Sequence, residues 1–434
     1  MILKKLLLLA ALLATLPALS RTLTVSPTGP FSTIRQAIGA AADGDTVRIR
    51  KGVYYLNNAV ITKSLTLLGE DYPLLHGADK YELLTLSGRH IVIKGLHFAH
   101  SGYSSMNDYA AIKVVDASDI TIENNRITGA YFGIHVANSD HFTIRNNRLS
   151  GLTRTEQTTG NGIHLWKCTD ALVQGNTVSG HRDGIYFEFV SASVVQDNRS
   201  EGNIRYGLHF MFSNDDRYVN NIFENNGAGV AVMYSKTVTM ERNRFRNNWG
   251  AAAYGLLLKE ISDSKIEGNL FFRNTVGLHL EGTNRIQVEQ NVFDRNGWAA
   301  RVQASCNDNN FRKNNFLGNT FDIATNGDLV LNHFEHNYWD KYEGYDLDRN
   351  GTGDVPYHPV SLYATVIEQN PNSLLLLRSF MVSLLDKAEK ALPSLTPEAL
   401  KDEKPLMRAW KDSLRVYKFT GLRVAGARLE LVNP

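Results

Sequence analysis

The sequence predicts an all-β protein folded as a right-handed parallel β-helix, and three observations support this fold class. An Asn-x-apolar signal recurs at intervals of 22 to 29 residues, most often 22 or 23. About eight residues after most of these asparagines, a glycine opens a short strand of alternating apolar residues, and a third short apolar segment follows. Short strands and turns at this period are typical of a solenoid of stacked coils, whose parallel crossovers favour the right hand. The asparagines are Asn125, Asn147, Asn176, Asn198, Asn221, Asn243, Asn269, Asn291, Asn314 and Asn337.

The residues that recur at the turns suit a turn conformation. Asparagine and glycine both tolerate left-handed backbone, and asparagine can also hydrogen-bond a neighbouring backbone group. The longer intervals carry insertions, one of them residues 152–161. Insertions into a solenoid fall in loops on its outside.

Residues 1–20 have the pattern of a signal peptide. Lys4 and Lys5 precede an apolar run that is too short for a comfortable membrane span, and Ala18-Leu19-Ser20 offers small residues for cleavage. We therefore expect an exported chain that begins near Arg21 and works in the periplasm. The β-helix domain is expected over residues 21–360.

Both ends of a solenoid leave an open sheet edge that needs cover. Near the N-terminus, Thr33 and Gln36 form a T-x-x-Q capping box, and Ile34, Ile38 and Ala41 mark one apolar helix face. Residues 361–434 form a C-terminal extension that is partly helical and amphipathic, because Arg378 and Asp386 interrupt its longest apolar run. This extension is expected to cap the last coil, to dock a partner, or to do both.

Charge and cysteine content exclude some classes of protein. The formal net charge of +2 argues against nucleic acid as the main partner. Two cysteines in 434 residues do not make a disulfide framework. Cys168 and Cys306 lie six coils apart, or roughly 29 Å at about 4.8 Å per coil, which is too far for a bridge.

Stacking converts offsets from the strand-opening glycine into columns of side chains. The first and third residues after each glycine are apolar, so they are expected to face the core, and the second and fourth to face outward. The second-position column reads His135, His164, Tyr186, His209, Ala231, Leu257 and His279. The fourth-position column reads Ala137, Trp166, Glu188, Met211, Met233, Lys259 and Glu281, with Cys168 expected nearby at the sixth position.

The outward columns predict a soft metal site. An imidazole from His209 and thioethers from Met211 and Met233 suit copper, and thioether in particular favours Cu(I). His164 and Glu188 lie in neighbouring column positions and complete the candidate ligand set. Two other interpretations stay open for this face, namely a patch that packs against a loop or partner and a carbohydrate-binding groove.

Residues 346–351 open like a calcium loop. Asp346, Asp348 and Asn350 precede Gly351, but the twelfth position is Tyr357, where an EF-hand needs glutamate. The segment is therefore not an EF-hand. A capping turn and a bound calcium ion both remain possible.

Several long runs resemble the NosD family of periplasmic maturation factors for nitrous oxide reductase. They include GNGIHLWKC, DGIYFEFV, RYGLHFMFSNDD, NNGAGVAVMYSKTVTM and NYWDKYEGYDLDRNGTGDVPYHPVSLY, and the likeness extends from about residue 22 to about residue 410. The resemblance implies assembly of the reductase copper centre in the periplasm. It also implies work with an ABC transporter, made of a membrane permease and a cytoplasmic ATPase, and with a lipoprotein copper chaperone as donor. Contact with the membrane is then expected only through the permease.

Two rival classes use the same scaffold. A uronate lyase or epimerase needs a base, an acid and a cation, which His209, Asp215, Asp216 and Arg217 could supply. A metal-free scaffold would bind partner proteins only. Turnover of uronate polymers separates the enzyme from the other two, and Cu(I) binding separates copper handling from the scaffold.

Overall fold

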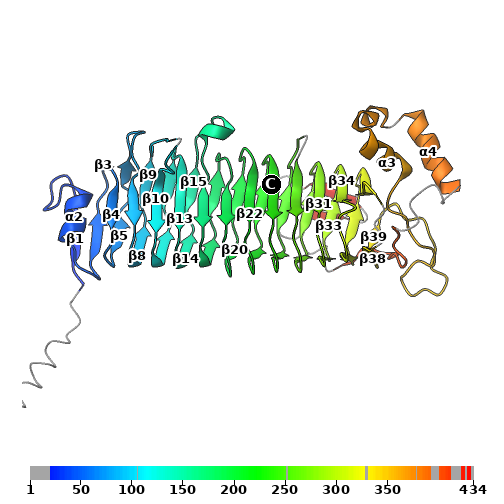
Figure 1. The fold of residues 1–434 in the computed structure, drawn as a ribbon, viewed down its shortest axis with the longest axis horizontal. Helices are drawn as coiled ribbons and strands as arrows, with labels where there is room; N and C mark the ends of the chain where they lie inside the picture. The colour runs from blue at the N-terminus through cyan, green and yellow to red at the C-terminus, as the bar shows by residue number, and fades with distance from the viewer. Residues whose placement is uncertain are drawn as a thin grey trace, which may run out of the picture.

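The computed structural model describes residues 20–434 apart from residues 105, 251–252, 328–330, 378, 392–399, 412–421, 426–427 and 432–434. The predicted signal peptide lies almost wholly outside the described residues, as do parts of the C-terminal extension. The described chain is an elongated parallel β-solenoid with helices at both ends (Figure 1). This confirms the predicted fold class. Among the described residues, no helix has the length and apolar character needed to cross a bilayer.

Three parallel sheets form the solenoid, and each complete coil contributes one strand to each sheet, whereas coils at the ends contribute fewer. We call them by their strand numbers: 14, 13 and 12. The 14-stranded sheet holds Thr22–Val25 (β1), Thr46–Ile49 (β2), Thr66–Gly69 (β5), Arg89–Lys94 (β8), Ser118–Glu123 (β11), Asp140–Arg145 (β14), Thr169–Gln174 (β17), Val194–Gln196 (β20), Arg217–Val219 (β23), Thr239–Glu241 (β26), Lys265–Glu267 (β29), Gln287–Glu289 (β32), Asn310–Arg312 (β35) and His333–Glu335 (β38).

The 13-stranded sheet holds Val53–Tyr55 (β3), Leu74–His76 (β6), His97–Ala99 (β9), Arg126–Thr128 (β12), Arg148–Ser150 (β15), Thr177–Ser179 (β18), Arg199–Glu201 (β21), Ile222–Glu224 (β24), Arg244–Arg246 (β27), Leu270–Phe272 (β30), Val292–Asp294 (β33), Asn315–Leu317 (β36) and Tyr338–Trp339 (β39). The 12-stranded sheet holds Ala59–Ile61 (β4), Leu84–Leu86 (β7), Ala110–Val115 (β10), Phe132–Ala137 (β13), Ile163–Trp166 (β16), Ile185–Glu188 (β19), Tyr206–Met211 (β22), Ala228–Met233 (β25), Tyr254–Lys259 (β28), Val276–Glu281 (β31), Trp298–Val302 (β34) and Phe321–Ala324 (β37).

The core is a set of ladders that run along the solenoid. The first residues after the strand-opening glycines are fully buried, as predicted: Ile134, Ile163, Ile185, Leu208, Val230, Leu256 and Leu278. A second ladder stacks aromatic rings face to face with centroids 4.0 to 5.7 Å apart, through Phe223, Phe245, Phe271, Phe293, Phe316 and Trp339. Both ladders bury apolar surface continuously from coil to coil.

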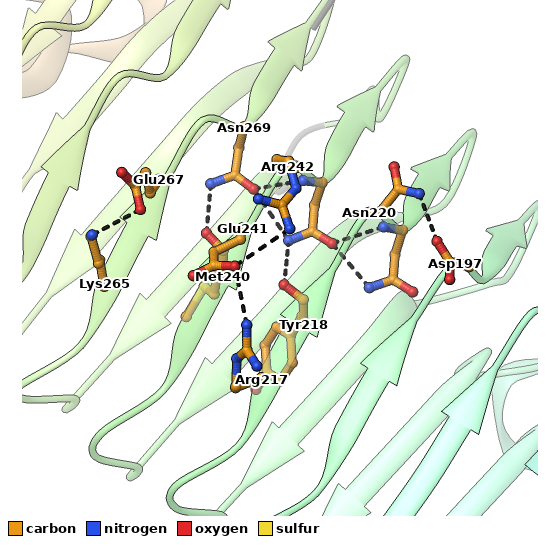
Figure 2. A network of polar contacts seen from close by, with 12 residues as sticks. Asp197, Arg217, Tyr218, Asn220, Met240, Glu241, Arg242, Lys265, Glu267 and Asn269 are labelled. Atoms are coloured by element: carbon orange, nitrogen blue, oxygen red, sulfur yellow. Dashed lines mark hydrogen bonds and ion pairs between the residues drawn. The ribbon is translucent and has the colours of Figure 1, made fainter. Parts of the chain in front are cut away.

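The recurring asparagines form a buried hydrogen-bonded ladder. The Asn269 amide, for example, donates to the Met240 carbonyl at 2.9 Å (Figure 2). It also donates to the Asn291 side chain at 3.0 Å. The left-handed residue of this turn is the one before each asparagine, such as Asn220 (φ 56) and Arg242 (φ 52), and not the ladder asparagine itself. Left-handed asparagine and glycine do occupy bends, as at Asn146 and Gly175, but the strand-opening glycines are not left-handed. They are required by close approach, because a Cβ at Gly207 would lie 2.7 Å from the Gly229 carbonyl oxygen.

Helices lie near both ends of the solenoid. Helix α2 (Ile34–Ala40) has the predicted capping box, with Thr33 Oγ1 accepting from the Gln36 N–H at 3.3 Å, and it buries Ile34 and Ile38. At the other end lie α3 (Leu362–Gln369), the 3-10 helix η2 (Pro371–Leu376) and α4 (Phe380–Ala391). The insertion at 152–161 projects outward with a short 3-10 helix, η1 (Glu156–Thr158) (Figure 1). The strands Leu422–Ala425 (β40) and Arg428–Leu431 (β41) pair antiparallel.

Cys168 and Cys306 do not pair with each other, as predicted, and both are buried. Cys168, however, does not lie beside the outward columns. Lys167 adopts left-handed backbone (φ 50), which ends the strand alternation and turns the Cys168 side chain into the core. Its thiol donates to the Trp166 carbonyl at 3.3 Å, and burial raises its pKa to about 11.

Candidate metal site on the 12-stranded sheet

Strands β16, β19, β22 and β25 bring the predicted columns into register. His164 pairs with Tyr186, Tyr186 with His209, and His209 with Ala231. In the fourth-position column, the paired residues are Trp166, Glu188, Met211 and Met233. The fourth-position side chains from Trp166 to Met233 are half-buried at the outer surface. The sequence offsets therefore gave the correct neighbours across four coils.

The histidines of the second-position column are covered, although they lie outside the coil core. His209 is only 4% exposed. The Tyr206 and Tyr186 rings both pack against it, each with its centroid 4.8 Å away. The same cover recurs where Phe132 lies against His135. The expectation of solvent-facing imidazoles is thus corrected, because an aromatic residue just before the glycine packs over the ring.

Tyr186 separates the two candidate histidines. Its ring centroid lies 4.7 Å from that of His164 and 4.8 Å from that of His209. Two rungs amount to roughly 9–10 Å, whereas metal–imidazole bonds are about 2 Å long. In this arrangement His164 and His209 do not share one ion. The compact group is His209, Met211 and Met233, with Tyr186 and Glu188 beside them.

The Tyr186 hydroxyl links the two columns. It lies 3.2 Å from Glu188 Oε2 and 3.6 Å from Met211 Sδ, within reach of donation to either. Burial, and then the Glu188 charge, raises the pKa of Tyr186, so the phenol remains a donor at neutral pH. Burial also holds the pKa of His164 well below its usual value. A neutral imidazole is the form that binds metal.

The donor set is sulfur-rich rather than carboxylate-rich. Over the described ranges, no cluster of three or more His, Cys, Asp or Glu side chains is arranged to hold a metal ion. Any metal at this face would therefore depend on the two methionine sulfurs. Such a set favours a soft monovalent ion over zinc.

Sequence reasoning missed Asp183, which lies beneath this site. Its carboxylate is fully buried, with Oδ2 at 3.9 Å from His209 Nδ1. Arg182 Nε lies 3.5 Å from Oδ2, and Arg205 Nε lies 3.9 Å from Oδ1. The sequence feature that could have revealed it is the acidic side chain just before a strand-opening glycine. The neighbouring coils carry asparagine or tyrosine at this position.

The residues considered for a lyase or epimerase do not converge. Arg217 begins β23 in the 14-stranded sheet, where it pairs with Glu241 at 3.3 Å (Figure 2). Asp215 lies at the intervening corner (φ 59). Asp216 is buried and accepts the Ser193 N–H at 2.8 Å, and burial raises its pKa to about 8. His209 lies on another sheet, so these four side chains form no common acid–base site.

The candidate calcium loop is closed by its own hydrogen bonds. Asp346 accepts the Asn350 N–H at 3.1 Å and the Gly351 N–H at 2.9 Å. Asp348 accepts the Asn350 amide at 2.8 Å. These contacts are those of a tight turn, and calcium at Asp346, Asp348 and Asn350 stays a prediction.

The sequence matches a family model described as "Periplasmic copper-binding protein (NosD)" over residues 92–155 and 149–344. A protein of Pseudomonas aeruginosa named "Probable ABC transporter binding protein NosD" is 31% identical over 382 residues, which cover 85% of this chain and 89% of that protein. A protein of Stutzerimonas stutzeri with the same name is 27% identical over 120 residues, or 27% of this chain and 28% of that protein.

Solved structures with a similar fold are distant in sequence. The catalytic unit of a GH87 α-1,3-glucanase from Streptomyces thermodiastaticus has a TM-score of 0.58 at 16% identity, covering 75% of this chain and 70% of that one. A PL6 alginate lyase has a TM-score of 0.56 at 14% identity, covering 74% and 86%. At these identities the likeness concerns the β-helix alone. The family-model match and the long alignment to the P. aeruginosa protein show that the chain belongs to the NosD family of periplasmic copper-binding proteins.

Proposed function

We propose that this protein is a periplasmic accessory factor that handles Cu(I) as cargo during maturation of nitrous oxide reductase. The observation that carries the proposal is the register of Met211 and Met233 on adjacent coils, with His209 two residues before Met211 on the same strand. Thioether and imidazole together form a donor set suited to Cu(I). The name of the matching family, a copper-binding periplasmic protein, supports the same metal.

The surroundings of the three donors suit transfer rather than storage. The Tyr186 hydroxyl contacts Met211 Sδ, and the His209 ring packs against Tyr186 and Tyr206. Cargo would have to displace these contacts, which lowers net affinity and eases release. Glu188 supplies a nearby carboxylate, and His164, one rung beyond Tyr186, offers a separate imidazole for an ion in passage.

The C-terminal extension supports association with an ABC transporter. Leu375 on η2 is 90% exposed, and Phe380 and Met381 on α4 are 82% and 55% exposed, so both helices present apolar side chains to solvent. Apolar surface of this kind commonly marks a protein interface. The relatives are named ABC transporter binding proteins. We propose that this surface meets the membrane permease, whose cytoplasmic ATPase drives the system, and that a lipoprotein chaperone supplies the copper.

Titration of the purified mature protein with Cu(I), in competition with a chromophoric chelator, tests the proposal. The protein should bind one Cu(I) with modest affinity, and Zn(II) should not displace it. Addition of the Cu(I)-loaded lipoprotein chaperone should load the same site. An absence of Cu(I) binding under both conditions would contradict copper handling and favour the metal-free scaffold.

A further inference from the structure

We propose that Asp183 is a positioning residue that holds the His209 imidazole with Nδ1 protonated and Nε2 bare, ready to bind metal. The inference rests on the proposed function for its purpose, although the tautomer is a property of the metal-free protein. The first evidence is the place of Asp183 in its column. The residues just before the strand-opening glycines are Phe132, Asn161, Asp183, Tyr206, Ala228, Tyr254 and Val276, and only Asp183 is acidic.

The Asp183 carboxylate is held rigidly in the protein. Its side chain is fully buried, Oδ1 accepts the Tyr206 N–H at 3.3 Å, and Arg182 and Arg205 lie on either side within 4 Å. Burying a carboxylate without a partner costs folding free energy, and here two guanidinium groups offset this cost. The charge is therefore built into the site rather than left there by chance.

His209 needs an external group to choose its tautomer. Neither ring nitrogen has a hydrogen-bond partner within the described part of the chain, and both are shielded from solvent. Asp183 Oδ2, which also lacks a hydrogen bond, is 3.9 Å from Nδ1. That separation exceeds a hydrogen bond, but a negative charge at about 4 Å in a buried site still orders an N–H dipole strongly. The proton is thus drawn to Nδ1, which leaves the lone pair on Nε2.

This arrangement is the outer half of a carboxylate–histidine–metal unit. In such units the carboxylate sets the ring tautomer and orientation, and loss of it commonly lowers metal affinity about 10- to 100-fold. Here the carboxylate and the imidazole come from neighbouring coils, because Asp183 precedes β19 and His209 lies on β22. Solenoid stacking alone brings them together, without a dedicated loop.

Nitrogen-15 NMR of histidine-labelled, metal-free protein tests the proposal, with the His209 signals assigned by their loss in His209→Gln. The expected result is a protonated Nδ1 and a bare Nε2. In Asp183→Asn this preference should weaken, and Cu(I) affinity should fall about 10- to 100-fold. Asp216→Asn, which removes another buried carboxyl group, should change neither.

Three results would overturn the inference. They are a protonated Nε2 in the wild-type protein, a doubly protonated ring, and an unchanged tautomer in a folded Asp183→Asn variant. The wild-type spectrum decides the matter even if that variant fails to fold. If the predicted tautomer is found but Cu(I) does not bind, the proposed function fails while the positioning by Asp183 stands.

Discussion

Asp402 Oδ2 accepts hydrogen bonds from both the backbone N–H and the side-chain amide of Asn337, each at 3.0 Å, across 65 residues of sequence. The same oxygen accepts the Trp339 indole N–H at 3.1 Å. Asn337 is the last rung of the asparagine ladder, so its donors have no further asparagine to bond. Asp402 takes the place of the missing rung and ties the C-terminal extension to the end of the solenoid.

Replacement of Asp402 with Ala should therefore fray the last coil. The Asn337 and Trp339 donors would be left unpaired in a buried site, which should lower the free energy of unfolding by about 1–3 kcal/mol. Hydrogen exchange across residues 333–339 should accelerate. Glu403→Ala is the matched control, because Glu403 is exposed and pairs only with Lys401 at 3.0 Å among the described contacts. Equal exchange in both variants would contradict the capping role.

The coil register predicts a severe effect at Leu208. This side chain is fully buried in the ladder after the strand-opening glycines, so Leu208→Asp would bury an unpaired charge and should prevent folding. Tyr234→Asp is the control, because Tyr234 lies exposed at a left-handed corner that tolerates aspartate. Circular dichroism and thermal melting compare the two. A Leu208→Asp protein that melts normally would show that the register is wrong.

Asp216 predicts a pH dependence of stability. Burial raises its pKa from 3.8 to about 8, so the folded protein binds this proton more tightly than the unfolded chain. The stabilisation is fully present below about pH 4 and is lost as pH rises through about 8. Within that window the unfolding free energy should fall by at most about 1.4 kcal/mol per pH unit. Asp216→Asn, which can still accept the Ser193 N–H, should flatten the slope in denaturant titrations at pH 5–8. The exposed control Asp215→Asn should leave most of this pH dependence in place. An unchanged slope in Asp216→Asn would show that other groups cause the pH dependence.

The apolar surface on η2 and α4 should be needed for transporter association. Deletion of the extension is a poor test, since residues 400–411 contain Asp402 and the buried Leu400. The triple change Leu375→Ser, Phe380→Ser, Met381→Ser instead alters only exposed side chains and should leave the melting temperature nearly unchanged. Co-purification with the permease should be lost. Val53→Ser with Tyr55→Ser, exposed apolar residues at the opposite end, is the control and should co-purify normally. If the triple variant still co-purifies with the permease, the docking site lies on another surface.

Local repetition made most of the fold predictable. The Asn-x-apolar period located every coil from Asn125 to Asn337, and the glycine offsets placed Met211 beside Met233. The cap at Asp402 was not predictable, because no period links it to Asn337. The inward turn at Cys168 recurs in other coils, because Phe189, Phe212 and Tyr234 are left-handed like Lys167, but the residue type at this corner varies and gives no sequence signal. The burial of His209 depends on Tyr206, and Asp183 escaped notice because its partners come from the next coil. These two contacts, and the cap at Asp402, are not part of the repeating pattern.

The copper content of nitrous oxide reductase matured with the Met211→Leu, Met233→Leu variant shows whether Met211 and Met233 carry copper. The double change nearly conserves volume at two half-buried positions, so it should cost less than about 1.5 kcal/mol of stability per site and leave permease binding intact. The account predicts a folded, transporter-bound variant that leaves the reductase short of catalytic copper. Fully copper-loaded, active reductase obtained with this variant would contradict it and would reduce the two methionines to a packing role.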